Sequence, residues 1–129
     1  MVTSVVWLGE GNSLAAAPAE LISVVPGGSG PLSSFDYAPS VSGDGNIVVF
    51  NSNDFIEGLV EDVYVRNRAN GTTTHVPQPV LPFGQPLDRM NGGVVSRDGC
   101  HVVFWGLYLF DDPAGEWNIY KWNRCAANS

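Results

Sequence analysis

Acidic side chains gather in two segments of the chain, where they could hold a hard cation. Carboxylate oxygens are the ligands that Ca²⁺ prefers in proteins, but neither segment has the spacing of a known calcium-binding loop. Two interpretations therefore stay open: acidic loops that only face solvent, and a calcium site in one or both segments. The residues concerned are Asp54, Glu57, Glu61 and Asp62 in the first segment and Asp111, Asp112 and Glu116 in the second. No other cofactor is expected.

The remaining polar residues form no recognisable catalytic or zinc-binding pattern. His75 and His101 are the only histidines, and no spacing of Cys, His and carboxylate residues resembles a zinc site. No serine stands in the Gly-x-Ser-x-Gly turn that exposes a catalytic nucleophile. We therefore expect a protein that is not an enzyme.

Aromatic residues are concentrated near the C-terminus, and two interpretations of them stay open. Aromatic side chains bury large areas between packed sheets, and Trp and Tyr are also enriched at interfaces. The cluster could therefore be packing, or a surface for sugar stacking or subunit contact. Its members are Trp105, Tyr108, Phe110, Trp117 and Trp122. Trp105 and Trp117 flank a loop, so we expect them to be the most exposed.

The chain has two cysteines, Cys100 and Cys125. If the segments on either side of the Asp111-Asp112 loop pair as a hairpin, the two cysteines fall nearly opposite one another. This predicts a disulfide, which would fix the last strand and favour an extracellular or periplasmic location. No signal peptide is recognisable in residues 1–7, so this location is expected if a signal has been removed.

A repeat sets the positions of all these residues. The segment 42–50 (SGDGNIVVF) is answered by 96–104 (SRDGCHVVF). An Asp-Gly pair between apolar runs predicts a hairpin turn, here at Asp44-Gly45 and at Asp98-Gly99. A carboxylate in such a turn accepts backbone N–H groups. Because the aspartate recurs in each copy, we expect it to be structural rather than catalytic or metal-binding.

The pattern of β-branched and alternating residues predicts short strands throughout. The middle copy has four, at 37–41, 46–52, 61–67 and 72–76. The last copy has three, at 93–95, 101–105 and 117–122, and the first has two, at 5–7 and 21–24. We therefore divide a single unit, 1–129, into an incomplete copy (1–36), a complete copy (37–77), a Pro-rich loop (78–91) and a copy without its last strand (92–125).

Repeats of four strands are typical of β-propeller blades. The predicted fold is therefore all-β, with about 2.5–3 four-stranded antiparallel blades in the chain. Closed propellers usually have 4–8 blades. We expect the ring to be completed by oligomerisation, two chains giving about six blades, or the chain to belong to a larger polypeptide. A head-to-tail contact that does not close would instead build a filament.

One family resemblance rests on the middle copy, and it covers roughly residues 37–123. The residues that carry it are Pro39-Ser40-Val41-Ser42-x-Asp44-Gly45, Val48-Val49-Phe50, Asp62-Val63-Tyr64-Val65-Arg66 and Asn70-Gly71-Thr72-Thr73-Thr74. This pattern resembles the TolB-type propeller repeat of exported bacterial proteins. The resemblance implies the propeller fold but no single activity, since such propellers serve as scaffolds, partner-binding platforms and substrate gates.

Charge excludes some partners. The net charge is −7, with only six Lys and Arg residues, so neither nucleic acid nor an anionic membrane surface is an expected partner. No apolar run approaches the length of a membrane span.

The function we expect is a non-catalytic structural or interaction module that self-assembles through its incomplete blades and binds protein. The alternatives are a lectin-like carbohydrate-binding propeller and a propeller fragment of a larger exported hydrolase.

Overall fold

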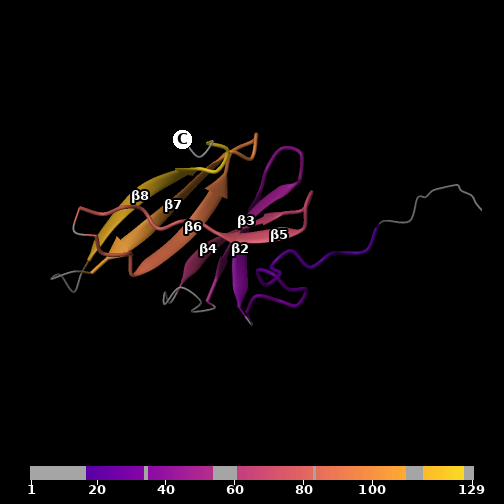
Figure 1. Ribbon diagram of the computed structural model, residues 1–129, viewed down its shortest axis with the longest axis horizontal. Coiled ribbons are helices and arrows are strands. Elements are labelled where there is room, and N and C mark those ends of the chain that lie inside the picture. The colour runs from indigo at the N-terminus through magenta and orange to yellow at the C-terminus, as the bar shows by residue number, and fades with distance from the viewer. Residues whose placement is uncertain (1–16, 34, 54–60, 83, 110–114, 127–129) are drawn as a thin grey trace, which may run out of the picture.

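The computed structural model describes residues 17–33, 35–53, 61–82, 84–109 and 115–126, and in these residues every regular element is a β-strand. The strands form two antiparallel sheets, ordered β2-β3-β4-β5 and β6-β7-β8 (Figure 1). The first sheet contains β2 (Asp36–Val41), β3 (Ile47–Ser52), β4 (Asp62–Asn67) and β5 (Thr72–His75). The second contains β6 (Arg89–Val95), β7 (His101–Tyr108) and β8 (Glu116–Asn123). The all-β class is thus confirmed, and so are the seven strands predicted after residue 36.

Two sequence-based boundaries need correction. β6 begins at Arg89, so it takes in the last residues of the expected Pro-rich loop, because they pair with Trp105, Gly106 and Leu107 of β7. The strand expected at 21–24 is not formed: residues 17–33 contribute only an isolated bridge between Val24 and Pro31. Prolines and glycines in this segment favour turns over a continuous strand. The strand expected at 5–7 lies outside the described residues.

The core lies between the two sheets, where β6 packs on β2, β3 and β4. Successive side chains of a strand point to opposite faces. One face of the first sheet therefore presents Ile47, Val49, Val63 and Val65 to the second sheet, which contributes Met90, Val95, Val102 and Phe104. On the opposite face of the first sheet, Phe50 and Tyr64 pack against Leu32, Ile22 and Val25 of the segment 17–33. β3 is consequently buried on both sides.

A polar network also joins β6 to the first sheet. Asn51 donates a hydrogen bond from Nδ2 to Asn91 Oδ1 (2.6 Å), and Asn91 Nδ2 donates to Tyr37 Oη (3.2 Å) and to Glu61. Arg89 Nη1 donates to Glu61 Oε2 at 3.3 Å. Burial, followed by the negative charge of Glu61, raises the pKa of the Tyr37 hydroxyl above its ordinary value. This network fixes the lateral position of β6, which apolar packing alone would leave loosely defined.

The two sheets repeat one another in detail. The pairing register shifts between Tyr37 and Ser40 in β2 and at the equivalent place between Asn91 and Val94 in β6. Asn91 lies 54 residues after Tyr37, the spacing that also separates Asp44 from Asp98. Both bulges contain a residue with positive φ, Ala38 at 54° and Gly92 at 66°. The repeat therefore includes the bulge as well as the turn.

The second bulge brings β6 very close to the first sheet at Gly93. A Cβ atom at position 93 would lie 2.6 Å from Cγ1 of Val49 and 2.7 Å from Cγ1 of Val63. Both distances are well inside van der Waals contact, and both valines are fully buried. A residue without a side chain is thus required where the sheets meet.

We predict that Gly93→Ala lowers the free energy of unfolding by about 1–3 kcal/mol, the usual cost of overpacking a core. Gly30→Ala is the matched control, because a Cβ atom there would meet nothing within 4 Å. Urea unfolding followed by tryptophan fluorescence measures both. Equal midpoints for the two variants would contradict this description of the interface.

Candidate interaction site

The recurring aspartates bind their own turns. Ser42 Oγ donates to Asp44 Oδ1 (2.8 Å), Asn46 N donates to the same oxygen (2.9 Å), and Ile47 N donates to Ser42 Oγ (3.1 Å). The second turn repeats all three bonds: Ser96 Oγ to Asp98 (2.5 Å), Cys100 N to Asp98 (3.0 Å) and His101 N to Ser96 Oγ (3.0 Å). Gly45 and Gly99 have φ values of 80° and 78°. These are the bonds expected of a structural turn.

Each turn is also held by an arginine that the sequence analysis missed. Arg68 Nη1 donates to the carbonyl oxygen of Gly45, and Arg124 Nε donates to that of Gly99, both at 2.9 Å. The arginines follow β4 and β8 at the same place. The signal in the sequence was the repeated Asn-Arg dipeptide at 67–68 and 123–124.

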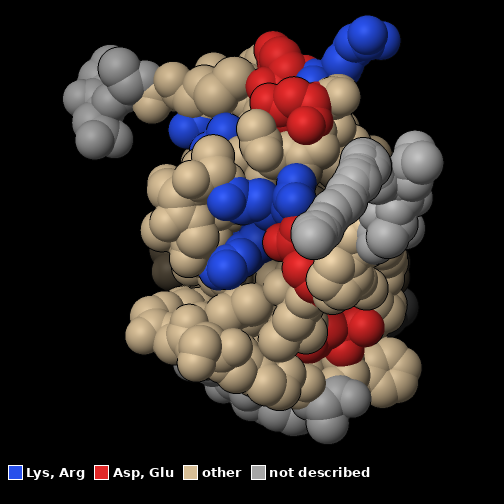
Figure 2. All heavy atoms as spheres, turned by 90° about the vertical axis from the view of Figure 1, so that its right-hand side faces the viewer, with Lys and Arg blue, Asp and Glu red and all other residues tan. Residues whose placement is uncertain are grey.

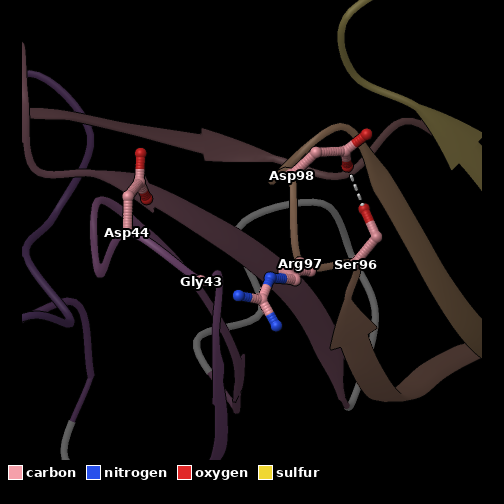
Figure 3. A pocket seen from close by; sticks show the side chains of 5 residues that line it. All are labelled: Gly43, Asp44, Ser96, Arg97 and Asp98. Atoms are coloured by element: carbon pink, nitrogen blue, oxygen red, sulfur yellow. Dashed lines mark hydrogen bonds between the residues drawn. The ribbon is translucent and has the colours of Figure 1, made fainter.

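The two turns touch each other where the sheets meet. Gly43 N donates to the carbonyl oxygen of Arg97 at 2.7 Å, and these two residues line an open hollow of 640 Å³ together with Asp44, Ser96 and Asp98. Figure 3 shows the Arg97 side chain reaching toward Gly43, while Asp98 is turned back to Ser96. Both carboxylates accept hydrogen bonds from their own turns.

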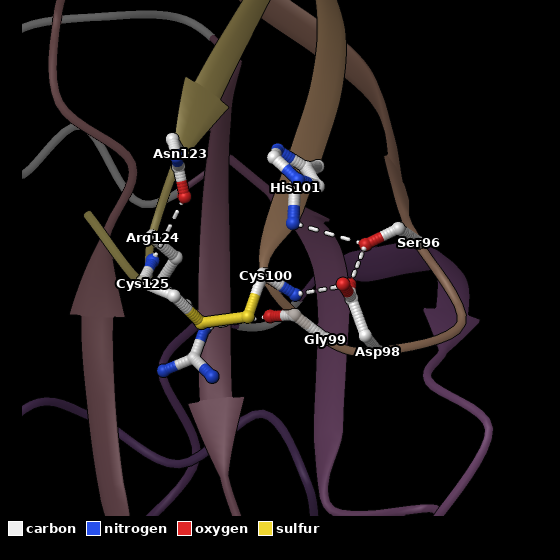
Figure 4. The surroundings of a disulfide bond; sticks show 8 residues. All are labelled: Ser96, Asp98, Gly99, Cys100, His101, Asn123, Arg124 and Cys125. Atoms are coloured by element: carbon white, nitrogen blue, oxygen red, sulfur yellow. Dashed lines mark hydrogen bonds between the residues drawn. A yellow bond between two sulfur atoms is a disulfide. The ribbon is translucent and has the colours of Figure 1, made fainter.

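Cys100 and Cys125 form the predicted disulfide, with their Cα atoms 5.0 Å apart. The bond joins the residue before β7 to a residue just after β8, beside the turn held by Asp98 (Figure 4). It is consistent with an extracellular or periplasmic location. No helix in the described part of the chain is long and apolar enough to span a membrane.

The acidic residues proposed for calcium fall into two groups. Asp54, Glu57, Asp111 and Asp112 lie outside the described residues, so their role stays a prediction. Asp62 is bonded to His75 and to its own sheet at Val63 N, Glu61 belongs to the network with Asn91, and Glu116 is exposed on β8. Within the described ranges, no three His, Cys, Asp or Glu residues come together as a metal site.

Basic and acidic side chains lie close together on the side of the molecule that carries β5 and the segment 17–33 (Figure 2). In this region Arg68 forms an ion pair with Glu20. The pairing lowers the pKa of the Glu20 carboxyl, chiefly through the hydrogen bond from Arg68. Charges of both signs thus offset one another here, and no continuous basic surface appears in this view.

The C-terminal aromatic residues divide between the two faces of the second sheet. Tyr108 and Trp122 are half-buried and pack against the core, which is the packing role that the sequence left open for them. Trp105 and Trp117 lie on the other face with their rings 4.6 Å apart and nearly perpendicular. With Asn118 and Ile119 they line a hollow of 410 Å³. Phe110 lies outside the described residues.

This second face, which we call the open face, is apolar and largely exposed, although Trp105, which we expected to be as exposed as Trp117, is half-buried. Its residues are Val94, Val103, Trp105, Trp117, Ile119 and Lys121, with Ile119 69% exposed, Val94 55% and Trp117 52%. The register pairs Val103 with Lys121 and Trp105 with Ile119, as it pairs Val49 with Val65 and Asn51 with Val63 in the first sheet. The open face is therefore the equivalent of the face that β6 covers in the first sheet. Among the described residues, no strand pairs with the outer edge of β8 either, whereas β4 pairs with β5.

Comparisons with protein-family models, curated proteins and solved structures find no match for this chain. The open face must therefore be interpreted from its own geometry.

We predict that removing the Cys100–Cys125 disulfide lowers the free energy of unfolding by about 3 kcal/mol, because the bond closes a loop between residues 25 apart in sequence. Denaturant unfolding with and without a reductant measures the change. The double variant Cys100→Ser, Cys125→Ser is the control and should not respond to the reductant. An unchanged midpoint for the wild type on reduction would contradict the prediction.

We also predict that the Asp98 carboxyl titrates below its ordinary value of 3.8, because Ser96 Oγ and Cys100 N donate to its ionised form. The ionised form thus stabilises the fold above about pH 4, and this contribution is lost as the pH falls through the lowered pKa. Ser96→Ala should raise the pKa of Asp98, measured by carbon-13 NMR of the carboxyl group.

Ser42→Ala is the matched variant in the first turn. It should move the pKa of Asp44 less, because the largest influence there is the backbone N–H of Asn46. A larger shift at Asp44 than at Asp98 would contradict this ranking of the two hydrogen bonds.

Proposed function

We propose that this chain is a non-catalytic assembly module that self-associates through the open face of its second sheet. The observation that carries the proposal is the repeat. Residues that are fully buried in the first sheet, such as Val63, have exposed equivalents in the second, such as Ile119. From the same repeat we propose that the two sheets are consecutive propeller blades of the TolB type and that a further blade would lie on the open face.

The free energy gained by burying apolar side chains favours a partner that covers the open face. Fully burying a Val or Ile side chain contributes about 1.5–3 kcal/mol, and contiguous exposed apolar patches on soluble proteins commonly mark interaction sites. The face carries one charged residue, Lys121, beside several apolar ones. The unpaired edge of β8 adds backbone groups that a neighbouring strand could satisfy.

A carbohydrate ligand is the second candidate, supported by the two perpendicular indoles. Trp105 and Trp117 form an aromatic corner against which a sugar ring could stack. However, sugar recognition also needs several hydrogen-bonding groups, and three of the four described residues that line the hollow, Trp105, Trp117 and Ile119, are aromatic or apolar. The hollow is thus better suited to an apolar protein surface.

We predict that Ile119→Asp weakens self-association more than about tenfold, because the contact would then bury an unpaired charge. Sedimentation velocity over a range of concentrations measures the change. Val80→Asp is the control: Val80 is 98% exposed and lies in the Pro-rich segment, among residues that do not belong to the open face. A wild-type chain that stays monomeric at every concentration would contradict the proposed function.

A glycan array with the wild type and Trp117→Ala tests the second candidate. Binding that is lost in the variant would favour a carbohydrate ligand. An array without signal, together with self-association, would favour the assembly module.

A further inference from the structure

We infer that the partner of the open face is the β2 strand of a second copy of this chain, bound head-to-tail as β6 is bound to the first sheet. The inference rests on the proposed function and adds the identity of the partner surface. It follows if the contact between the first and second sheets of one chain is repeated between the second sheet of that chain and the first sheet of another.

Three sets of contacts define how β6 lies on the first sheet. Gly93 lies against Val49 and Val63, and Val95 belongs to the same buried cluster. Asn91 is hydrogen-bonded to Asn51 and Glu61, and Arg89 to Glu61. The turns meet where Gly43 N donates to the carbonyl oxygen of Arg97. Each of these residues has an equivalent one repeat later or earlier.

The equivalents of the β6 residues lie on or beside β2, and their side chains are available. Phe35, Pro39 and Val41 occupy the places of Arg89, Gly93 and Val95. Phe35 and Val41 are each 58% exposed and Pro39 is exposed as well, whereas Gly93 and Val95 are buried. β2 thus presents the exposed side chains of Pro39 and Val41, with the exposed Phe35 just before the strand.

The segment 17–33 leaves Phe35, Pro39 and Val41 exposed. However, it occupies the face equivalent to the one that Phe104 presents to the first sheet, so the contact between copies is limited to β2. It covers the outer face of the first sheet at Phe50 and Tyr64, which belong to β3 and β4. Between residues 20–23 of the segment and β2 lies a groove of 280 Å³, lined by Pro39, Val48 and Phe50 among others.

The open face and the incoming β2 both carry aromatic residues where their equivalents inside the chain carry polar ones. In the first sheet, Asn51 and Glu61 meet the polar Asn91 and Arg89. On the open face the places of Asn51 and Glu61 are taken by Trp105 and Trp117, as the strand registers show. On the incoming strand the places of Asn91 and Arg89 are taken by Tyr37 and Phe35, whose rings pack edge-to-face at 5.2 Å. Tyr37 is half-buried and its hydroxyl accepts from Asn91 of its own chain, so Phe35 is the exposed ring of the two. A polar pairing inside the chain thus becomes an aromatic pairing between copies.

Pro39 of the incoming copy takes the place of Gly93 and faces Val103 and Ile119 as Gly93 faces Val49 and Val63. Because Pro39 has a side chain and Gly93 has none, β2 would lie farther from the open face than β6 lies from the first sheet. Within the chain, Gly43 N donates to the carbonyl oxygen of Arg97. Between copies the repeat exchanges the two residues, so that Arg97 N of one copy would donate to the carbonyl oxygen of Gly43 of the other. Such a contact joins two different surfaces, so it is heterologous and leaves one open face and one β2 at the ends of each pair.

Mixing two variants tests this arrangement, with sedimentation velocity as the measurement. Ile119→Asp blocks the open face and Val41→Asp blocks β2, so we expect each variant alone to be monomeric. An equimolar mixture should form a dimer and nothing larger, because one intact open face then meets one intact β2. Trp117→Asp and Phe35→Asp are the second pair, used if thermal unfolding shows that a variant of the first pair is not folded. Val80→Asp, mixed with either variant, is the control.

The outcomes separate the two proposals. If Val41→Asp associates as the wild type does, or if the mixture stays monomeric while the wild type associates, the β2 partner is wrong although the open face still self-associates. If the wild type itself does not associate, both the proposed function and this inference fail.

Discussion

The close packing of β6 on the first sheet is the contact on which the rest of the structure depends. It buries Val49 and Val63 completely and is possible because Gly93 has no side chain there. Were the sheets farther apart, the dispersion contacts of the core would be lost, and so would the short hydrogen bond between Asn51 and Asn91. The bulge that places Gly93 at this point is therefore as important as the apolar residues themselves.

The second sheet is built like the first but stabilised differently. Its turn is closed by the same Ser-Asp-Gly bonds and the same arginine, but no described strand covers β8 as β5 covers β4. The Cys100–Cys125 disulfide lies where the first sheet continues into its fourth strand. A covalent bond at this place restrains the end of an edge strand that would otherwise fray. It leaves the open face and the edge accessible.

Local signals in the sequence were enough for much of the fold and for little of the site. Asp-Gly turns, β-branched runs and the two cysteines predicted the strands after residue 36 and the disulfide, because these depend on neighbouring residues. The strand expected at 21–24 was wrong, since the conformation of the segment 17–33 depends on its packing against Phe50 and Tyr64, far along the chain. The faces on which the aromatic residues lie could be assigned only once the strand register was known. Trp105 pairs with Ile119 and Val102 pairs with Trp122, which puts Trp105 and Trp122 on opposite faces of the sheet.

The central claim is that the open face and β2 are two halves of one repeated contact. The most direct measurement is the ¹⁵N NMR spectrum of the unmodified protein as its concentration is raised. The account predicts shifts of the indole N–H groups of Trp105 and Trp117 and of the β2 amides, with the buried Val49 amide unchanged. Shifts confined to other surfaces, or none at concentrations where the protein is soluble, would contradict it.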